Sequence, residues 1–329
     1  MDWPMSEEFE NPTQWNEFYE KSWLKRKETM SSIIASGETN PLRIINILSS
    51  DIRFTQEETR PSEGGADEPK FIYRKDNDYT MEDVRNVTIV NDRKSINITP
   101  QQHVPSGMRA DVKVAHRNNY INSPSYSKCD KIDFLVDYCR LRKFDAVIEL
   151  GSGYSQNLVK LFYQGGPRVP YYGGEFTKSG TECAQMLSKL TEDFELIPFR
   201  FDFRQPDFSM IEKYENVLVF SCHAIEQVNF IPGNLLTSIS ALAKQVTCIH
   251  MEPFGFQLSS PSTQNEVDKN HRSYFLDNGW NENLLSQLVL HSCNKNIDLQ
   301  YVGKNILGGS DVHNPSSLAL WKSVQHPLI

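Results

Sequence analysis

The feature that most constrains the fold is a regular alternation of strand-like and helix-like segments in the second part of the chain. From about residue 127, strands are predicted at 145–150, 169–175, 195–202, 216–222 and 245–251. Helical runs are predicted between them, at 156–163, 180–190, 207–213 and 233–243. Strands separated by helices form right-handed βαβ units, in which the strands lie parallel. The sequence therefore predicts an α/β fold with a doubly wound, mostly parallel sheet.

The C-terminal end of the chain breaks this alternation. Two further strands are predicted at 297–302 and 317–322, with only a loop rich in Gly, Asn and Pro between them. Successive strands without a crossover helix pair antiparallel. The prediction is a seven-stranded sheet that ends in an antiparallel hairpin.

The N-terminal part reads differently. Residues 1–126 are predicted to form a smaller mixed α/β appendage, and residues 127–329 the main domain. A helix is expected at 13–30, a second at 41–50, and a short hairpin at 87–90 with 95–99. The first helix carries four aromatic residues on one face: Trp15, Phe18, Tyr19 and Trp23. The appendage has no chemical motif and is interpreted either as a substrate lid or as the arm of a homodimer.

Composition narrows the functional classes. The chain has 34 Lys and Arg against 42 Asp and Glu, a formal net charge of −8, which argues against nucleic acid as a partner. No run approaches the roughly 20 apolar residues of a membrane helix. The acidic N-terminus has no apolar stretch typical of a secretory signal. We expect a soluble cytoplasmic protein with no membrane partner.

The first strand of the alternation runs into a glycine loop, Glu149-Leu150-Gly151-Ser152-Gly153. Parallel sheets bind ligands where the strands end, and glycines allow a ligand to approach the backbone. The NAD fingerprint needs a third glycine where this chain has Gln156, and a P-loop is absent. Glu175 ends the next strand, where a carboxylate can accept hydrogen bonds from ribose hydroxyls. An acid in such a loop suits a cationic ligand.

These segments resemble the class I S-adenosylmethionine-dependent methyltransferases. Residues 147–153 are similar to the first motif of that family and 172–175 to the acidic end of its second strand. Residues 201–203 resemble the strand end that flanks adenine, and 220–227 the fourth-strand motif. The resemblance covers roughly residues 127–329 and implies S-adenosylmethionine as the cofactor. It also implies these cofactor-binding residues: Glu149, Gly151, Ser152, Gly153, Glu175, Phe176, Asp202, Phe203, Ser221 and Cys222.

Methyl transfer is an in-line displacement, so the protein has to orient the nucleophile and, for a hydroxyl, remove a proton. A general base is therefore expected where the fourth and fifth strands end, and the catalytic candidates there are His223, Glu226 and Glu252. His223 is either this base or a buried, hydrogen-bonded histidine. Each glutamate either binds a substrate amine or guanidinium, or holds a neighbouring loop through backbone N–H groups. His250 is interpreted mainly as a packing residue.

Substrate contacts are expected from two further places. Tyr120 and Tyr126 run into the main domain from the appendage, and His271 and Tyr274 lie on the insertion after the fifth strand. That insertion is equally interpreted as a surface helix packed on the sheet. No Asp–Asn pair stands at the strand ends, so no metal is expected.

The expected function is methylation, at oxygen or nitrogen, of a small polar metabolite as the partner molecule. One alternative is a non-catalytic nucleoside-binding module of the same fold. A nicotinamide-dependent dehydrogenase is a second alternative, and the missing third glycine counts against it. The sequence does not identify the methyl acceptor.

Overall fold

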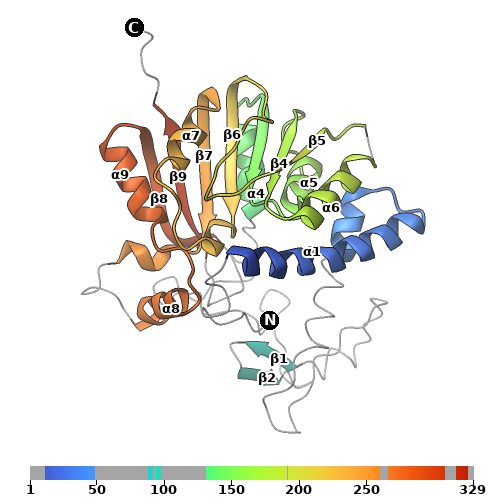
Figure 1. Cartoon of the computed structure of the whole chain (residues 1–329), viewed down its shortest axis with the longest axis horizontal. Coiled ribbons are helices and arrows are strands. Elements are labelled where there is room, and N and C mark those ends of the chain that lie inside the picture. The colour runs from blue at the N-terminus through green and yellow to red at the C-terminus, as the bar shows by residue number, and fades with distance from the viewer. Residues whose placement is uncertain are drawn as a thin grey trace.

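A seven-stranded sheet forms the centre of the computed structural model, which describes residues 12–48, 88–91, 94–97, 131–190, 192–259, 266–307 and 316–324 (Figure 1). The sheet order is β5-β4-β3-β6-β7-β9-β8. The strands are β3 Ala146–Leu150, β4 Tyr171–Glu175, β5 Leu196–Arg200, β6 Tyr214–Cys222, β7 Ala243–Glu252, β8 Ile297–Leu307 and β9 Ser316–Ser323.

The strands β3 to β7 pair parallel, and β9 pairs antiparallel with both β7 and β8. This confirms the predicted doubly wound sheet with its antiparallel C-terminal hairpin. The chain forms β3, β4 and β5 in one direction and then returns to place β6 on the other side of β3. The ends of β3 and β6 therefore flank the crevice in which sheets of this kind bind ligands.

Helices cover both faces of the sheet because successive strand residues point to opposite sides. Val147 and Leu218 pack with α4 Lys131–Arg140, α5 Gln156–Tyr163 and α6 Lys178–Ser188 in one hydrophobic core. Ile148 and Val219 pack with α7 Leu235–Ser240 and α9 Leu284–Cys293 in the other. The chain forms a three-layer α/β structure.

The helix predicted at 207–213 is wrong. This segment forms turns instead, and Asp207 accepts a hydrogen bond from the N–H of Ser209 at 2.9 Å. Such local side-chain bonds compete with helical backbone bonds, and Pro206 restricts the residue before it. The other predicted helices and strands of the main domain are present, with their ends shifted by a few residues.

The described N-terminal helices pack into the main domain. They are α1 Pro12–Ala35 and a helix at 41–48, and Met30 and Ile44 belong to the same core as α5 and α6. Figure 1 shows α1 lying across the end of the sheet below the strands. The predicted hairpin is confirmed as the antiparallel pair β1 Thr88–Asn91 and β2 Lys94–Asn97. The domain boundary at residue 126 stays a prediction.

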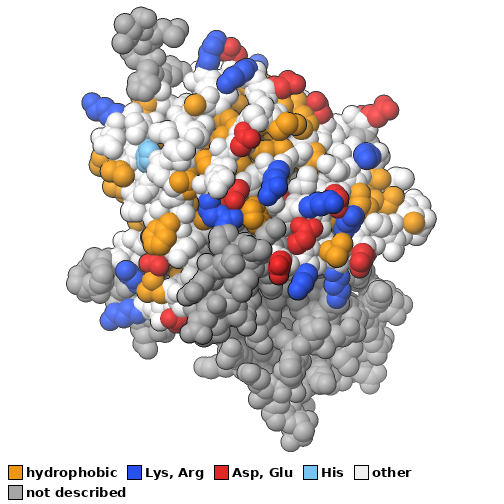
Figure 2. Space-filling view, in the orientation of Figure 1, with side chains coloured by type: hydrophobic (Ala, Val, Ile, Leu, Met, Phe, Trp, Pro, Cys, Tyr) orange, Lys and Arg blue, Asp and Glu red, His pale blue; other side chains and the backbone are white. Residues whose placement is uncertain are grey.

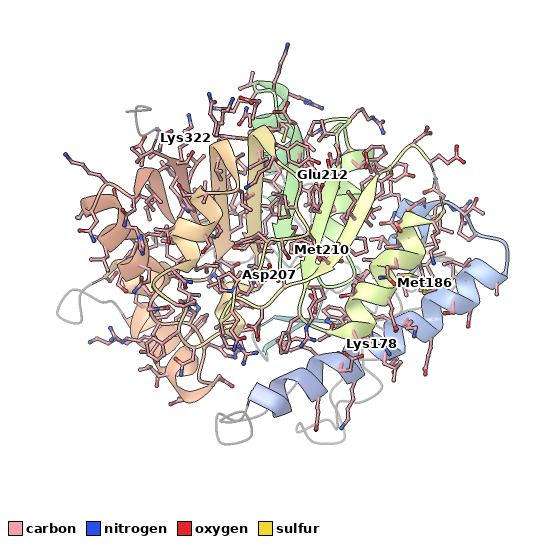
Figure 3. All side chains as sticks on the ribbon, turned by 45° about the horizontal axis from the view of Figure 1, so that its top comes forward. Lys178, Met186, Asp207, Met210, Glu212 and Lys322 are labelled. Atoms are coloured by element: carbon pink, nitrogen blue, oxygen red, sulfur yellow. The ribbon has the colours of Figure 1, made fainter. Side chains whose placement is uncertain are left out.

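The contact between α1 and α6 is specific as well as apolar. The carboxylate of Glu20 accepts hydrogen bonds from the N–H groups of Lys178 and Ser179, at 2.8 and 2.9 Å. These are orphan donors in the first turn of α6, so an acid at this end also complements the helix dipole. Figure 3 shows Lys178 and Met186 on α6 beside α1, and Figure 2 shows charged side chains of both signs over this end. The two helices form one unit with a polar outer surface.

None of the helices in the described ranges combines the length and the apolar character needed to cross a membrane.

Candidate functional site

A cavity of about 720 Å³ opens where β3, β4, β5 and β6 end. It lies at the switch of strand order, as the sheet topology requires. Of the residues predicted from the sequence, the cavity is lined by Gly151, Ser152, Gly153, Glu175, Phe176, Asp202, Phe203, Cys222, His223 and Glu226. Further lining residues, which were not among the site residues named from the sequence, are Tyr19, Trp23, Tyr154, Gln156, Asn157, Thr177, Phe201, Arg204, Gln227, Asn229, Phe230, Leu276 and Asn278; of these, Phe201 and Gln227 lie within the segments that carry the resemblance.

The glycine loop needs its glycines for two reasons. Gly151 and Gly153 have φ of 76° and 55°, in the left-handed region that other residues rarely adopt. A Cβ on Gly151 would overlap with the Cβ of Ala224, in the loop after β6. The N–H groups of Gly151 and Ser152 both donate to the carbonyl of Gly174, at 2.8 and 2.9 Å. The loop therefore turns tightly beneath the cavity.

Glu175 lines the cavity and also holds the glycine loop. Its Oε2 accepts from the N–H of Gly153 at 2.8 Å, and its Oε1 accepts from the N–H and the hydroxyl of Thr177 at 3.0 and 2.7 Å. Burial raises the pKa of Glu175, and these hydrogen bonds oppose the rise. Glu175 therefore lies on the cavity wall, and its role toward a cofactor stays a prediction.

Glu149 lies beneath the cavity and does not line it. It is fully buried, and burial raises its pKa to about 8 although Asn157 donates to its Oε1 at 2.7 Å. Its Oε2 has no hydrogen-bond partner among the described residues. Glu149 therefore contacts Asn157, a residue of the cavity lining, without reaching the cavity itself.

At the end of β5, Asp202 is already engaged by a cation. Its two oxygens accept from the Nε and Nη2 of Arg204, both at 2.9 Å. The guanidinium of Arg204 lies 5.0 Å from the ring centre of Phe176. Asp202, Arg204, Phe176 and Phe203 form one wall of the cavity. The two rings make this wall aromatic, and the charge of Asp202 is paired with that of Arg204.

His223 and Glu226 come together in the loop after β6. The Nδ1 of His223 lies 3.3 Å from the Oε2 of Glu226, and its Nε2 lies 2.6 Å from the hydroxyl of Ser316 on β9. The contact with Ser316 is a hydrogen bond whose donor depends on the tautomer of the ring, whereas the contact with Glu226 is an ion-pair distance. His223 also has a φ of 51°, an unusual backbone conformation for a histidine. No sequence signal pointed to Ser316, which is 93 residues away.

Glu252 does not line the cavity. Its carboxylate accepts hydrogen bonds from the N–H groups of Ala224 and Ile225, at 3.0 and 3.3 Å. Burial and the negative charge of Glu226 raise its pKa to about 7. Of the two interpretations open from the sequence, this contact is that of a loop-holding acid.

His250 and Ser221 also lie behind the cavity. The hydroxyl of Ser221 is 3.0 Å from the Nδ1 of His250, and the indole N–H of Trp321 donates to its Nε2 at 3.0 Å. Burial lowers the pKa of His250 to about 3, so the ring is neutral. Its contacts are those of the packing residue that the sequence favoured.

Helix α1 supplies one side of the cavity. Tyr19 donates to the Oε1 of Gln227 at 2.5 Å, and the ring of Trp23 packs against Gly153. Burial and the negative charges of Glu226 and Glu175 raise the pKa of Tyr19 well above its usual value. The aromatic spacing in the sequence predicted a buried face of this helix, but not that the face would line the site.

The insertion after β7 contributes residues from the C-terminal end of its helix to the cavity lining. The helix α8 Glu266–Asp277 leads into Asn278, which lines the cavity together with Leu276. His271 does not line it: its ring packs 4.8 Å from that of Phe275. The side chain of Tyr274, and Tyr120 and Tyr126 as a whole, lie outside the described residues.

Metal-ligating side chains are dispersed. Within the described part of the chain, no three His, Cys, Asp or Glu side chains come together as a metal site.

Comparison with known proteins gives similar structures but no sequence relative. No family model and no curated protein matches the chain. The geranyl diphosphate C-methyltransferase from Streptomyces coelicolor A3(2), solved with Mg²⁺, geranyl diphosphate and S-adenosylhomocysteine, aligns with a TM-score of 0.42 at 10% identity, covering 59% of this chain and 78% of that one. The CcbJ methyltransferase from Streptomyces caelestis aligns with a TM-score of 0.40 at 12% identity, covering 59% and 89%.

A methyltransferase from Aquifex aeolicus aligns with a TM-score of 0.37 at 11% identity, covering 61% of this chain and 94% of that one. Because these TM-scores are low, the fold is assigned from the strand order and the strand pairing of this chain itself. The parallel sheet whose strand order switches at β3 and which ends in an antiparallel hairpin agrees with the fold that the sequence resemblance implied.

Proposed function

We propose that the protein is an S-adenosylmethionine-dependent methyltransferase that acts on oxygen or nitrogen of a small polar acceptor, without a metal. The observation that carries this proposal is the cavity at the β3–β6 switch, in which a tight glycine loop and the Glu175 carboxylate face the same space. The enzyme is expected to work in the cytoplasm.

The residues present fit this cofactor. The cavity volume falls within the range of about 300–1,000 Å³ typical of small-molecule sites. Glu175 has acceptor capacity for ribose hydroxyls, while Phe176 and Phe203 offer flat apolar surfaces for a base. A carboxylate at Glu175, on the cavity wall, favours a ligand with positive charge, whereas Glu149, with its pKa raised to about 8, is largely protonated near neutral pH.

The bound cofactor would supply the electrophilic methyl group, so the chain itself has to position the acceptor and handle one proton. The pair formed by His223 and Glu226 lies on the cavity wall and is the proposed proton-handling group. Glu252 holds the backbone of the loop that carries this pair. Tyr19 and Trp23 close one side of the cavity and limit the access of water.

One observation favours the second candidate function, a nucleoside-binding module without turnover. The Nε2 of His223 is hydrogen-bonded to Ser316 and its Nδ1 lies 3.3 Å from Glu226, so both ring nitrogens are turned toward other side chains. In this candidate the cavity binds the nucleoside and the His223 contacts only hold the loop.

Two measurements test the proposal in sequence. Calorimetric titration with S-adenosylmethionine, S-adenosylhomocysteine and NAD should show binding of the first two and not of NAD. A screen of hydroxyl and amine compounds, read as release of S-adenosylhomocysteine, should then identify an acceptor. Binding without release across the screen would favour the binding module, and preference for NAD would reject both candidates.

A further inference from the structure

A series of three hydrogen-bonded side chains joins the N-terminal helix to the loop after β6. The hydroxyl of Tyr19 on α1 donates to the Oε1 of Gln227 at 2.5 Å, and the Nε2 of Gln227 donates to the Oε1 of Glu226 at 2.8 Å. All three residues line the cavity, and Glu226 is 4% exposed. Tyr19 and Gln227 are 208 positions apart in the chain, so the packing of α1 against the cavity brings them together.

The hydrogen-bond roles in this series follow from the chemistry of its two ends. An ionised carboxylate can only accept, so the amide of Gln227 turns its NH₂ toward Glu226 and its carbonyl oxygen toward Tyr19. The phenol then has to donate. It keeps its proton, because burial and the charges of Glu226 and Glu175 raise the pKa of Tyr19 well above its usual value. A flipped amide would place its oxygen against the carboxylate, so the Tyr19 hydroxyl favours the orientation that binds an ionised Glu226.

The backbone of Glu226 is held separately from its side chain. Its carbonyl accepts from the N–H of Asn281, in the segment after α8, at 2.9 Å. Glu252 accepts from two N–H groups earlier in the same loop. These contacts fix where the Glu226 side chain begins, and the amide of Gln227 then acts on where its carboxylate ends.

Resting on the proposed function, we infer that Tyr19 is a positioning residue, which acts through Gln227 to hold the Glu226 carboxylate ionised and oriented at the cavity wall. An amide is a neutral donor, so it stabilises the charged form of the carboxylate without cancelling its charge. Helix α1 then contributes to the proton-handling group of the site as well as to the enclosure of the cavity.

The titratable groups that face Glu226, among the described residues, come from its own loop, from β7 and from α1. They are His223, whose Nδ1 lies 3.3 Å from the Oε2 of Glu226, Glu252, whose pKa is raised by burial and by the charge of Glu226, and Tyr19. A protonated His223 would favour the charged form of Glu226, and an ionised Glu252 would oppose it. Substitutions at Gln227 and Tyr19 leave both of these groups in place, so a changed titration of Glu226 reports the hydrogen bonds.

The test titrates Glu226 directly and needs no acceptor. Carbon-13 NMR of the full chain, with glutamate labelled at its side-chain carboxyl and S-adenosylhomocysteine added, follows the resonance that Glu226→Gln removes. In the unmodified protein this carboxyl should be ionised at about pH 7. Gln227→Met should raise its pKa by about one pH unit, because the charged form loses a hydrogen bond. A carboxyl that is still protonated at about pH 7 in the unmodified protein would overturn the inference without any variant.

Substitutions of the tyrosine then separate positioning from packing. Tyr19→Phe keeps the ring but removes the donor, and it should raise the pKa of Glu226 by about half a pH unit. In a Gln227→Met background Tyr19→Phe should add nothing further, because its effect passes through the amide. Tyr154→Phe is the matched control, since this second tyrosine of the cavity wall donates to Gln156 at 2.9 Å instead of Gln227.

Three results would count against the inference or its premise. An unchanged pKa of Glu226 in Tyr19→Phe, or an equal rise in Tyr154→Phe, would show that Tyr19 only packs. An equal effect of Tyr19→Phe with and without Gln227 would show that the tyrosine acts on the carboxylate directly, which overturns the route through the amide. Failure of the unmodified protein to bind S-adenosylhomocysteine would instead reject the proposed function, while the titration without ligand would still read the hydrogen bonds.

Discussion

The indole ring of Trp23 lies directly over Gly153, so that a Cβ added to this glycine would meet the ring at 3.0 Å. This contact joins the N-terminal helix to the glycine loop, two segments 130 positions apart in the chain (153 − 23). The guanidinium of Arg26 stacks on the Trp23 ring, 4.3 Å from the ring centre. Helix α1 is therefore part of the cavity wall, and its removal should affect cofactor binding directly.

Trp23→Ala should weaken the binding of S-adenosylhomocysteine by about tenfold, or about 1.4 kcal/mol, because it opens the cavity to water beside the glycine loop. Trp23→Phe should retain most of the affinity, since an aromatic ring still covers Gly153. Leu24→Ala is the control on the adjacent, exposed position of α1. Calorimetric titration measures all three; equal affinities in Trp23→Ala and the parent protein would remove α1 from the site.

Gly153→Ala should lower the free energy of unfolding by more than Gly279→Ala. Both glycines have similar positive φ, 55° and 61°, so the backbone cost of about 1–2 kcal/mol is common to both. Only at Gly153 does the new methyl group meet a side chain, whereas nothing lies within 4 Å of a Cβ on Gly279. Urea unfolding of the two variants compares them, and equal losses would mean that the Trp23 contact is loose.

Glu175→Gln should weaken S-adenosylhomocysteine binding by about 1.5–3 kcal/mol, the usual worth of hydrogen bonds to a charged acceptor. The amide NH₂ would also face one of the N–H donors that the carboxylate now satisfies, in Gly153 or Thr177. Glu212→Gln provides the charge control, because Glu212 is exposed just before β6 starts, at the opposite end of the sheet from the cavity (Figure 3). A titration in which both variants bind like the parent would make Glu175 a purely structural acid.

Glu226→Gln should reduce turnover by a factor of about 10²–10⁴, the range for loss of a general base, while S-adenosylhomocysteine affinity stays within a few-fold. Steady-state kinetics with the acceptor found by the screen measures this effect. His223→Asn, whose side chain tolerates the left-handed backbone, should cause a smaller loss if the carboxylate of Glu226 takes the proton and His223 only lies beside it. If His223→Asn removes turnover and Glu226→Gln does not, the roles are reversed.

Acid should destabilise the protein partly through His250. The pKa of His250 is lowered to about 3 in the folded state, and its ordinary value is about 6.5. Between these pH values the unfolded chain binds a proton at His250 and the folded chain does not. Its contribution is thus fully present above pH 6.5 and is lost as the pH falls toward 3, by up to about 1.4 kcal/mol per pH unit. Urea unfolding of the parent and of His250→Gln at several pH values should show a shallower acid slope in the variant; parallel slopes would contradict this.

Much of the fold could be predicted because it depends on local patterns. The segments around Val147 and Leu158 have the periodicity of a buried strand and of an amphipathic helix, and both are present in the structure. The glycines at 151 and 153, and the acid at the end of the next strand, are also a local pattern. They predicted at which end of the sheet the cavity opens. The segment at 207–213 failed because the periodicity test does not weigh a local turn bond such as that of Asp207.

What the sequence by itself determined is thus the order of strands and helices, the antiparallel end of the sheet and the place of the glycine loop, all of which follow from residues close in the chain. Only the tertiary structure decided which polar side chains reach the cavity. Glu226 and Glu252 could not be told apart in the sequence, yet one lines the site and the other binds the backbone behind it. Likewise, the contacts of Trp23 with Gly153 and of Ser316 with His223 join positions far apart in the chain. Such contacts depend on how helices and strands pack in space, and no short-range periodicity records that packing.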